Sequence, residues 1–217
     1  MAGAGYQFEF CGTALAALAS GALYSESERL LVVSDLHLGK SERIARLGGA
    51  LLPPYEVEDT LMRLDAAIGA LAPRLMICLG DSFDDLAAAN LPEAGRLWLA
   101  RLMAGRRWVW ITGNHDPAPV DLGGEHRADL RLGPLIFRHI SDGTAQGEVS
   151  GHYHPKFRLA GQARPCFLLG GARLILPAFG TYTGGLFADD PVLRRLMGPG
   201  ALAILTGKVA RPVPLAV

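Results

Sequence analysis

The chain has 217 residues and a formal charge of zero, with 21 basic and 21 acidic side chains. This length is sufficient for one α/β domain with a substantial core, and we expect a single domain over residues 1–217. The balanced charge excludes a protein that binds polyanions through its net charge alone, so any contact with nucleic acid must be local.

The cysteines and the N-terminus bear on the compartment. Cys11, Cys78 and Cys166 form no C-x-x-C pair and lie in apolar, strand-like sequence. This pattern favours buried thiols in a reducing compartment over a disulfide or a nucleophile. No basic residue precedes an apolar run at the N-terminus, and the uncharged segment 10–24 is too short to span a bilayer. We therefore expect a cytoplasmic protein that is not inserted in a membrane.

The first strands lead to a D-x-H motif. Alternating polar and apolar side chains in Tyr6–Phe10 predict an edge strand, and residues 21–28 read as a polar turn. The uninterrupted apolar run Leu30–Val33 predicts a strand covered on both faces. Asp35 and His37 follow it directly, and residues two apart in an extended backbone project to the same side. The motif therefore aims a carboxylate and an imidazole at one point, although a capping Asp and a surface His would explain it equally well.

A second buried strand leads to a G-D motif. After a Pro-Pro pair, apolar spacing predicts a helix over Glu56–Leu71, and the next apolar run predicts a strand over Leu75–Leu79. Gly80 lets the backbone turn without a Cβ, so that Asp81 points into a site beyond the strand end. The alternative for Asp81 is the N-cap of a helix.

A third strand leads to a G-N-H-D motif. Residues 91–104 have a helical pattern, and the β-branched and aromatic residues of segment 106–112 predict a strand. Asn114 can offer an amide oxygen to a cation, and Asp116 is placed to orient His115 through a carboxylate–imidazole hydrogen bond. Ordinary turn chemistry is the alternative for Asn-His-Asp-Pro.

The remaining histidines follow two further strands. We expect a loop over residues 121–131, and segments 133–140 and 147–150 read as two strands of an antiparallel region. His139 alone is more often a structural histidine. His152 and His154 are a stronger signal, because H-x-H spacing on an extended backbone places two nitrogen donors on one face.

The C-terminal part is predicted to hold strands at residues 167–169, 174–176 and 201–205 and a short helix at Pro191–Met197. We find no internal repeat and no linker.

The motifs taken together resemble a known superfamily. Their order, D-x-H, G-D, G-N-H-D, H and G-H-x-H over residues 30–155, is similar to that of the calcineurin-like metallophosphoesterases. A narrower resemblance, over nearly the whole chain, is to the bacterial ligase-associated DNA damage response phosphoesterases. It is carried by the sequences D-L-H-L-G-K at 35–40, L-P-P-Y at 52–55, L-G-D-S-F at 79–83, P-A-F-G at 177–180 and T-G-G at 183–185. One departure is Asp84, whose position is often histidine in that subfamily.

The resemblance implies a four-layer α/β/β/α sandwich of two mixed sheets flanked by helices, with the site at strand ends. It also implies two divalent metal ions bridged by Asp81. One ion would be held by Asp35, His37, Asp81 and His154, and the other by Asp81, Asn114, His139 and His152. Carboxylate, amide and imidazole donors without thiolate favour Mn, Fe, Zn, Ni or similar ions over Ca or Mg. The resemblance points to manganese.

The implied reaction is phosphodiester hydrolysis. Two ions ~3.5–4 Å apart would activate a shared hydroxide for in-line attack at phosphorus. His115 would protonate the leaving oxygen or stabilise the pentacoordinate transition state, and Asp116 would fix its orientation. Lys40, Arg43 and Lys156 follow the metal motifs and could track a phosphate backbone, although solvated surface charge explains them as well.

The narrower resemblance implies a nuclease in DNA repair, acting on DNA and working with DNA ligase or helicase repair proteins. One alternative is a hydrolase of nucleotides or other small phosphoesters at the same site. Another is a scaffold that has lost catalysis, but the complete ligand set argues against it.

Overall fold

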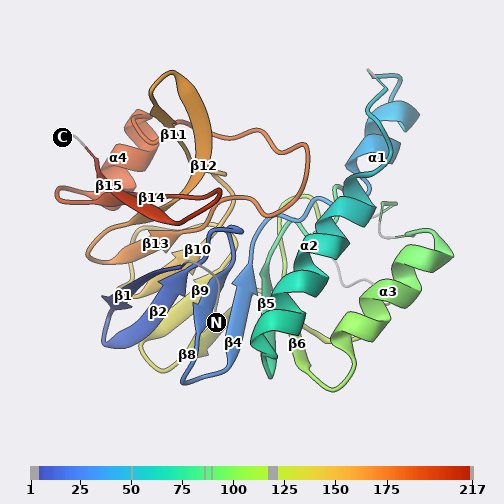
Figure 1. Ribbon diagram of the computed structural model, residues 1–217, viewed down its shortest axis with the longest axis horizontal. Coiled ribbons are helices and arrows are strands. Elements are labelled where there is room, and N and C mark those ends of the chain that lie inside the picture. Colours follow the sequence, from blue (N-terminus) through green and yellow to red (C-terminus); the bar gives the residue numbers. More distant parts are fainter. Residues whose placement is uncertain (1–4, 50, 86, 89, 117–121, 216–217) are drawn as a thin grey trace.

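The computed structural model describes residues 5–49, 51–85, 87–88, 90–116 and 122–215 (Figure 1). Within these ranges the strands form two sheets. The first sheet has seven strands in the order β1 (Tyr6–Phe10), β2 (Thr13–Ala17), β3 (Leu23–Ser25), β4 (Leu30–Val33), β5 (Leu75–Leu79), β6 (Arg107–Ile111) and β7 (Glu125–Arg127). The second has eight strands, in the order β15 (Arg211–Pro214), β14 (Leu202–Leu205), β12 (Gln162–Leu169), β13 (Arg173–Ile175), β10 (Glu148–Ser150), β9 (Leu135–Arg138) and β8 (Asp129–Leu132), with β11 (Lys156–Leu159) paired to β12.

Both sheets are mixed. Strands β4 to β7 are parallel to one another, whereas β1 to β4 pair antiparallel. In the second sheet β10 is parallel to β9 and β13, and the other pairs are antiparallel. The carboxyl ends of β4, β5 and β6 therefore meet at one edge of the first sheet, the position where open α/β sheets form their sites.

Three apolar clusters hold the layers together. Helices α2 (Glu56–Leu71) and α3 (Glu93–Met103) bury Leu61, Leu64 and Leu99 against the outer face of the first sheet. The two sheets pack face to face through a second cluster of buried side chains. Helix α4 (Pro191–Met197) covers the outer face of the second sheet with Leu193 and Met197. The predicted four-layer α/β/β/α sandwich is confirmed.

Several local predictions were wrong. The segment 21–28 contains strand β3, and the expected loop at 121–131 contains β7 and part of β8. These strands have three or four residues and contain polar side chains, so they leave no continuous apolar run. Strands β9 and β10 are parallel, not antiparallel, because the loop between them returns to the start of β9. Helix α1 (Lys40–Arg46), directly after the D-x-H motif, was not predicted. In the described part of the chain, no helix has the length and apolar character needed to cross a bilayer.

Candidate metal centre

The predicted metal ligands converge at one edge of the sandwich. Asp35 and His37 follow β4, Asp81 follows β5, and Asn114 follows β6. The loops after β9 and β10 bring His139, His152 and His154 to the same edge. Three groups of side chains each place their donor atoms within 4.8 Å of one another. These groups are Asp35–His37–His154, His37–Asp81–His115 and Asp81–His139–His152.

The backbone at these ligands is not the extended chain on which the spacing argument rested. Five of the predicted ligands have positive φ, namely Asp35 (52°), His37 (44°), Asp81 (45°), His152 (70°) and His154 (46°). Residues other than glycine rarely adopt this left-handed conformation, and it costs of order 1–3 kcal/mol each. Such strain persists where the surrounding structure imposes it, which is common at functional sites. The motifs converge through these tight turns and not through strand geometry.

Two histidines present a lone pair to the centre. The Nδ1 atom of His37 lies 2.7 Å from Asp84 Oδ1, and the Nδ1 atom of His139 lies 2.8 Å from the carbonyl oxygen of Leu79. Both acceptors require a proton on Nδ1, so in the neutral ring each Nε2 carries none and faces inward. His37 Nε2 is buried and has no hydrogen-bond partner in the described structure. A buried nitrogen with a free lone pair is what a metal ligand needs.

The donor atoms around His139 Nε2 and His154 Nε2 are arranged as around a cation. His139 Nε2 lies 3.0 Å from Asn114 Oδ1, 3.3 Å from Asp81 Oδ2 and 3.3 Å from His152 Nδ1. Similarly, His154 Nε2 lies 3.0 Å from Asp35 Oδ1 but has no partner of hydrogen-bond geometry among the described residues. Lone-pair atoms that face one another in a buried site are costly unless a positive charge lies between them. The donor set therefore fits metal ions.

The surroundings of Asp81 and His152 favour the ionisation states that bind metal, a carboxylate and a neutral imidazole. Burial raises the pKa of Asp81, but the hydrogen bond and charge of His139 and the backbone N–H of His115 outweigh it, so its pKa falls to about 2. Burial and the neighbouring His139 lower the pKa of His152. For His139, burial lowers the pKa, but the nearby carboxylates of Asp81 and Asp35 give a net rise. The same negative potential that attracts a proton to His139 would attract a metal ion.

His115 and Asp116 are close to the centre, but the predicted bond between them is wrong. The Nδ1 atom of His115 lies 2.8 Å from the carbonyl oxygen of Asp84, and its backbone N–H donates to Asp81 Oδ1 over 2.9 Å. The Asp116 carboxylate instead accepts from the backbone N–H groups of Ser82 at 2.7 Å and of Asp81, Phe83 and Gly113 at 3.0–3.3 Å. Asp116 therefore holds the turn that carries Asp81, because its side chain points back to the end of β5.

The predicted substrate residues fall in two places. Lys40 Nζ and Arg43 Nη1 lie 3.4 Å and 3.0 Å from the carboxylate of Asp84, which is fully buried. Lys156, on β11, has its Nζ 3.4 Å from the carbonyl oxygen of Thr183. Asp84 itself was noted in the sequence only as a departure from the resemblance. Its carboxylate contacts His37, a predicted ligand. In the sequence, the signal that could have pointed to it is its position three residues after Asp81.

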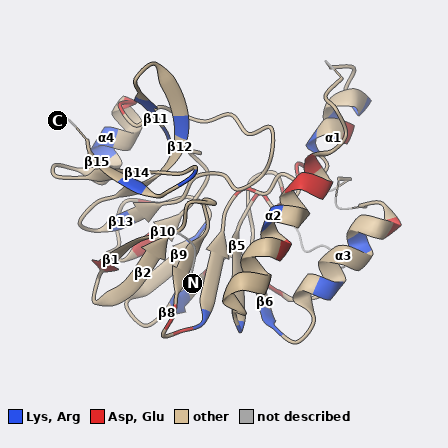
Figure 2. Cartoon of the chain, viewed as in Figure 1, with Lys and Arg blue, Asp and Glu red and all other residues tan. Residues whose placement is uncertain are grey.

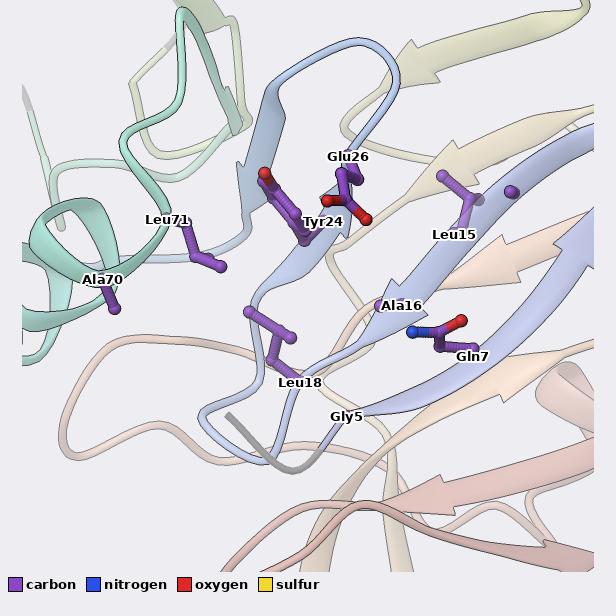
Figure 3. Close-up of a pocket in the computed structure, with 10 residues that line it drawn as sticks. Gly5, Gln7, Leu15, Ala16, Leu18, Tyr24, Glu26, Ala70 and Leu71 are labelled. Atoms are coloured by element: carbon purple, nitrogen blue, oxygen red, sulfur yellow. The ribbon is translucent and has the colours of Figure 1, made fainter. Parts of the chain in front are cut away.

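A cavity elsewhere in the protein has different chemistry. It has a volume of about 450 Å³ and lies against β1–β3 and the end of α2, lined in part by Gln7, Tyr24 and Glu26 (Figure 3). Its lining among the described residues contains one carboxylate and no histidine. Among the described residues, the groups that could hold a metal ion lie at the other site.

A four-layer sandwich with clustered carboxylate, amide and imidazole donors at strand ends defines a hydrolase of the metal-dependent class. Residues 28–187 match the family described as calcineurin-like phosphoesterase, and the chain belongs to this family. Members of this family bind two divalent metal ions. The predicted superfamily is thus confirmed.

A solved structure is also similar. The crystal structure of the nuclease MPE from Pseudomonas putida is 29% identical in sequence and superposes with a TM-score of 0.76. The alignment covers 96% of this chain and 100% of that one. No curated protein matches the sequence significantly.

Proposed function

We propose that the protein is a nuclease that hydrolyses phosphodiester bonds with two divalent metal ions. The observation that carries this proposal is the shared carboxylate of Asp81, which belongs to one donor group with His37 and to another with His139 and His152. One ion would be held by Asp35, His37, Asp81 and His154. The other would be held by Asp81, Asn114, His139 and His152. Carboxylate, amide and imidazole donors favour manganese or a similar transition metal.

When bound, the ions supply Lewis acidity that activates water and neutralises charge on the phosphoryl oxygens. The side chains of the chain position the substrate and move protons around them. Because Nδ1 of His115 donates to the carbonyl of Asp84, its Nε2 is the ring atom left to face the leaving oxygen, and the doubly protonated ring has a proton there to give. Asp116 fixes the turn at Asp81, and Lys40 and Arg43 place positive charge on the Asp84 side of the centre.

The substrate assignment has separate support. The similar Pseudomonas putida protein is a nuclease, and its alignment covers nearly all of both chains. The sequence resemblance to ligase-associated phosphoesterases favours DNA, a role in repair with ligase and helicase partners, and a cytoplasmic location.

The test compares substrates on the manganese-reconstituted protein. We expect two metal ions per chain by elemental analysis and manganese-dependent cleavage of bis(p-nitrophenyl) phosphate and of labelled single-stranded, duplex or nicked DNA. Asp81→Asn should lower metal content and abolish both activities, since a neutral amide bridges two cations poorly. Efficient hydrolysis of p-nitrophenyl phosphate or nucleotides without any DNA cleavage would refute the nuclease. Full activity with one metal per chain would refute the two-ion centre.

A further inference from the structure

The neutral net charge of the chain conceals a strong asymmetry. Residues 151–217 contain eight basic and two acidic residues, a formal charge of +6, whereas residues 1–150 contain 13 basic and 19 acidic residues, a charge of −6. Figure 2 shows the basic positions of β11, β12, α4 and β15 on the side of the molecule that holds the C-terminal strands. The eight are Lys156, Arg158, Arg164, Arg173, Arg194, Arg195, Lys208 and Arg211.

Most of this positive charge is not neutralised within the protein. Of the eight basic side chains, only Arg173 lies within salt-bridge distance of a carboxylate in the described structure, at 3.0 Å from Glu148. By contrast, Lys40 and Arg43 near the metal centre are both paired with Asp84. The C-terminal part therefore offers cations that are free to contact a polyanion, whereas the predicted contacts Lys40 and Arg43 are already engaged.

Three of these free cations line one groove. The groove has a volume of about 320 Å³ between β11, α4 and the end of β15, and Lys156, Arg158 and Arg194 line it. Its lining includes one carboxylate, Asp189, so the groove is net positive. The neighbouring Asp190 is engaged as the N-cap of α4, where its Oδ1 accepts from the backbone N–H of Val192 over 2.8 Å.

The groove is partly pre-organised. The guanidinium group of Arg158 stacks over the ring of Phe187, 4.5 Å from its centroid. Stacking of this kind restricts the side chain while leaving its N–H donors available, so less freedom is lost when it binds a phosphate.

The groove is also tied to the metal centre. Lys156 lies two residues after His154, at most about 7 Å further along the chain. Its backbone N–H donates to Leu186 over 2.8 Å, and its carbonyl accepts from Ala188 over 2.7 Å. The wall of the groove and a metal-binding histidine therefore belong to one hydrogen-bonded unit.

We propose that this groove binds the phosphate backbone of the nucleic-acid strand whose scissile bond lies at the metal centre. Lys156 meets the phosphate nearest the metals, and Arg158 and Arg194 meet phosphates further along the strand. This inference rests on the proposed nuclease function, and it assigns the direction in which the substrate leaves the centre.

The experiment measures binding separately from cleavage. The double variant Arg158→Gln/Arg194→Gln is compared with Arg96→Gln/Arg131→Gln, which removes two exposed arginines that have no salt bridge among the described residues and lie outside the groove. The ligand is a labelled single-stranded phosphorothioate oligonucleotide, which keeps the backbone charge and resists hydrolysis, and the protein is metal-loaded. Melting temperatures of all three proteins test whether each variant is folded.

We expect the groove variant to bind roughly tenfold more weakly than the wild type and the salt dependence of log K to fall by about 1.4, that is, ~0.7 for each lost contact to a single strand. The control variant should bind as the wild type does. Equal binding by the two variants would overturn the proposal, as would competition by polyglutamate as effective as that by unlabelled DNA. Hydrolysis of bis(p-nitrophenyl) phosphate by the wild type reports on the proposed function alone. If it is absent while the groove variant still loses binding, the groove stands and the nuclease does not.

Discussion

Replacing Asp84 by asparagine tests whether a buried carboxylate outside the ligand set controls metal binding. Asp84 Oδ1 accepts from His37 Nδ1 over 2.7 Å, while its Oδ2 lies 3.0 Å from Arg43 Nη1. An amide keeps one acceptor oxygen and gains two donors. If the oxygen stays on His37, the new NH₂ faces the guanidinium of Arg43. If it turns to Arg43, the NH₂ faces His37 Nδ1, which forces the proton of that ring onto Nε2, the atom aimed at the metals.

Both arrangements lose a hydrogen bond to a charged or polarised group, which is worth about 1.5–3 kcal/mol. Loss of the partner that orients a metal-binding histidine typically costs ~10–100-fold in metal affinity, or about 1.4–2.8 kcal/mol. We therefore expect Asp84→Asn to weaken manganese binding by that factor at the ion held by His37. Calorimetric titration of the metal-free protein with Mn²⁺ measures the effect.

The matched control is Asp85→Asn. Asp85 is the adjacent carboxylate and is paired with Arg43 and Arg46, and it contacts no histidine in the described structure. It should leave manganese affinity unchanged within about twofold, since exposed ion pairs contribute ~0–1 kcal/mol. Equal affinities in the two variants would refute the reasoning that Asp84 sets the tautomer of His37.

Three further predictions concern the centre and the thiols. Gly113→Ala should abolish metal binding, because the added Cβ would lie 2.1 Å from Asp81 Oδ1. The control is Gly69→Ala in α2, where an added Cβ would meet no atom within 4 Å. This control variant should melt at or above the melting temperature of the wild type. His115→Ala should reduce turnover by a factor of ~10²–10⁴ without changing the metal content, with both quantities measured on one preparation. A parallel loss of metal would show that His115 is a metal ligand. Iodoacetamide under native conditions should modify Cys11 alone, as counted by mass spectrometry, and should leave the activity unchanged. More than one adduct per chain would contradict this.

The cysteines show where sequence patterns are insufficient. All three were predicted to be buried in strands, and this holds for Cys78 and Cys166. Burial raises the pKa of Cys166 to about 12 and that of Cys78 well above its usual range. Cys11 was predicted wrongly, because it lies half-buried in the turn between β1 and β2 with φ 49°. A single apolar residue between two short strands looks the same in the sequence whether it continues a strand or turns the chain.

The long elements were predictable because their packing leaves a periodic trace. Helices α2 and α4 begin and end where apolar spacing, prolines and a capping aspartate place them, and β4 and β5 are fully apolar runs. The short strands β7 and β11 were missed, since β7 is entirely polar and β11 alternates basic and apolar residues at half-exposed positions. The parallel pairing of β9 with β10 depends on a contact between distant segments, which no local pattern records.

At the centre, the motifs predicted which side chains come together but not the structure that presents them. The seven predicted ligand residues do meet, yet through left-handed turns and not through the extended spacing used to predict them. The hydrogen-bond partners of the histidine rings could not be predicted from the sequence either. One is the main-chain carbonyl of Leu79, which has no side-chain signature, and another is the carbonyl of Asp84, which orients His115 in place of the predicted Asp116.

The glycines of the motifs explain why these short sequences occur together. A Cβ on Gly80, in the G-D motif, would lie 2.6 Å from the ring of His139, a ligand from the second sheet. A Cβ on Gly113, in the G-N-H-D motif, would lie 2.1 Å from the Asp81 carboxylate. Both distances are far below any van der Waals contact, so each glycine makes room for a ligand that belongs to another motif. A glycine that only allows a tight turn affects the conformation of its own loop. These two glycines also leave space for a predicted ligand from another motif, so the position of that ligand depends on the glycine. Substituting either glycine should therefore disturb the ions on both sides of Asp81 together, which is the behaviour of one linked centre and not of several independent sites.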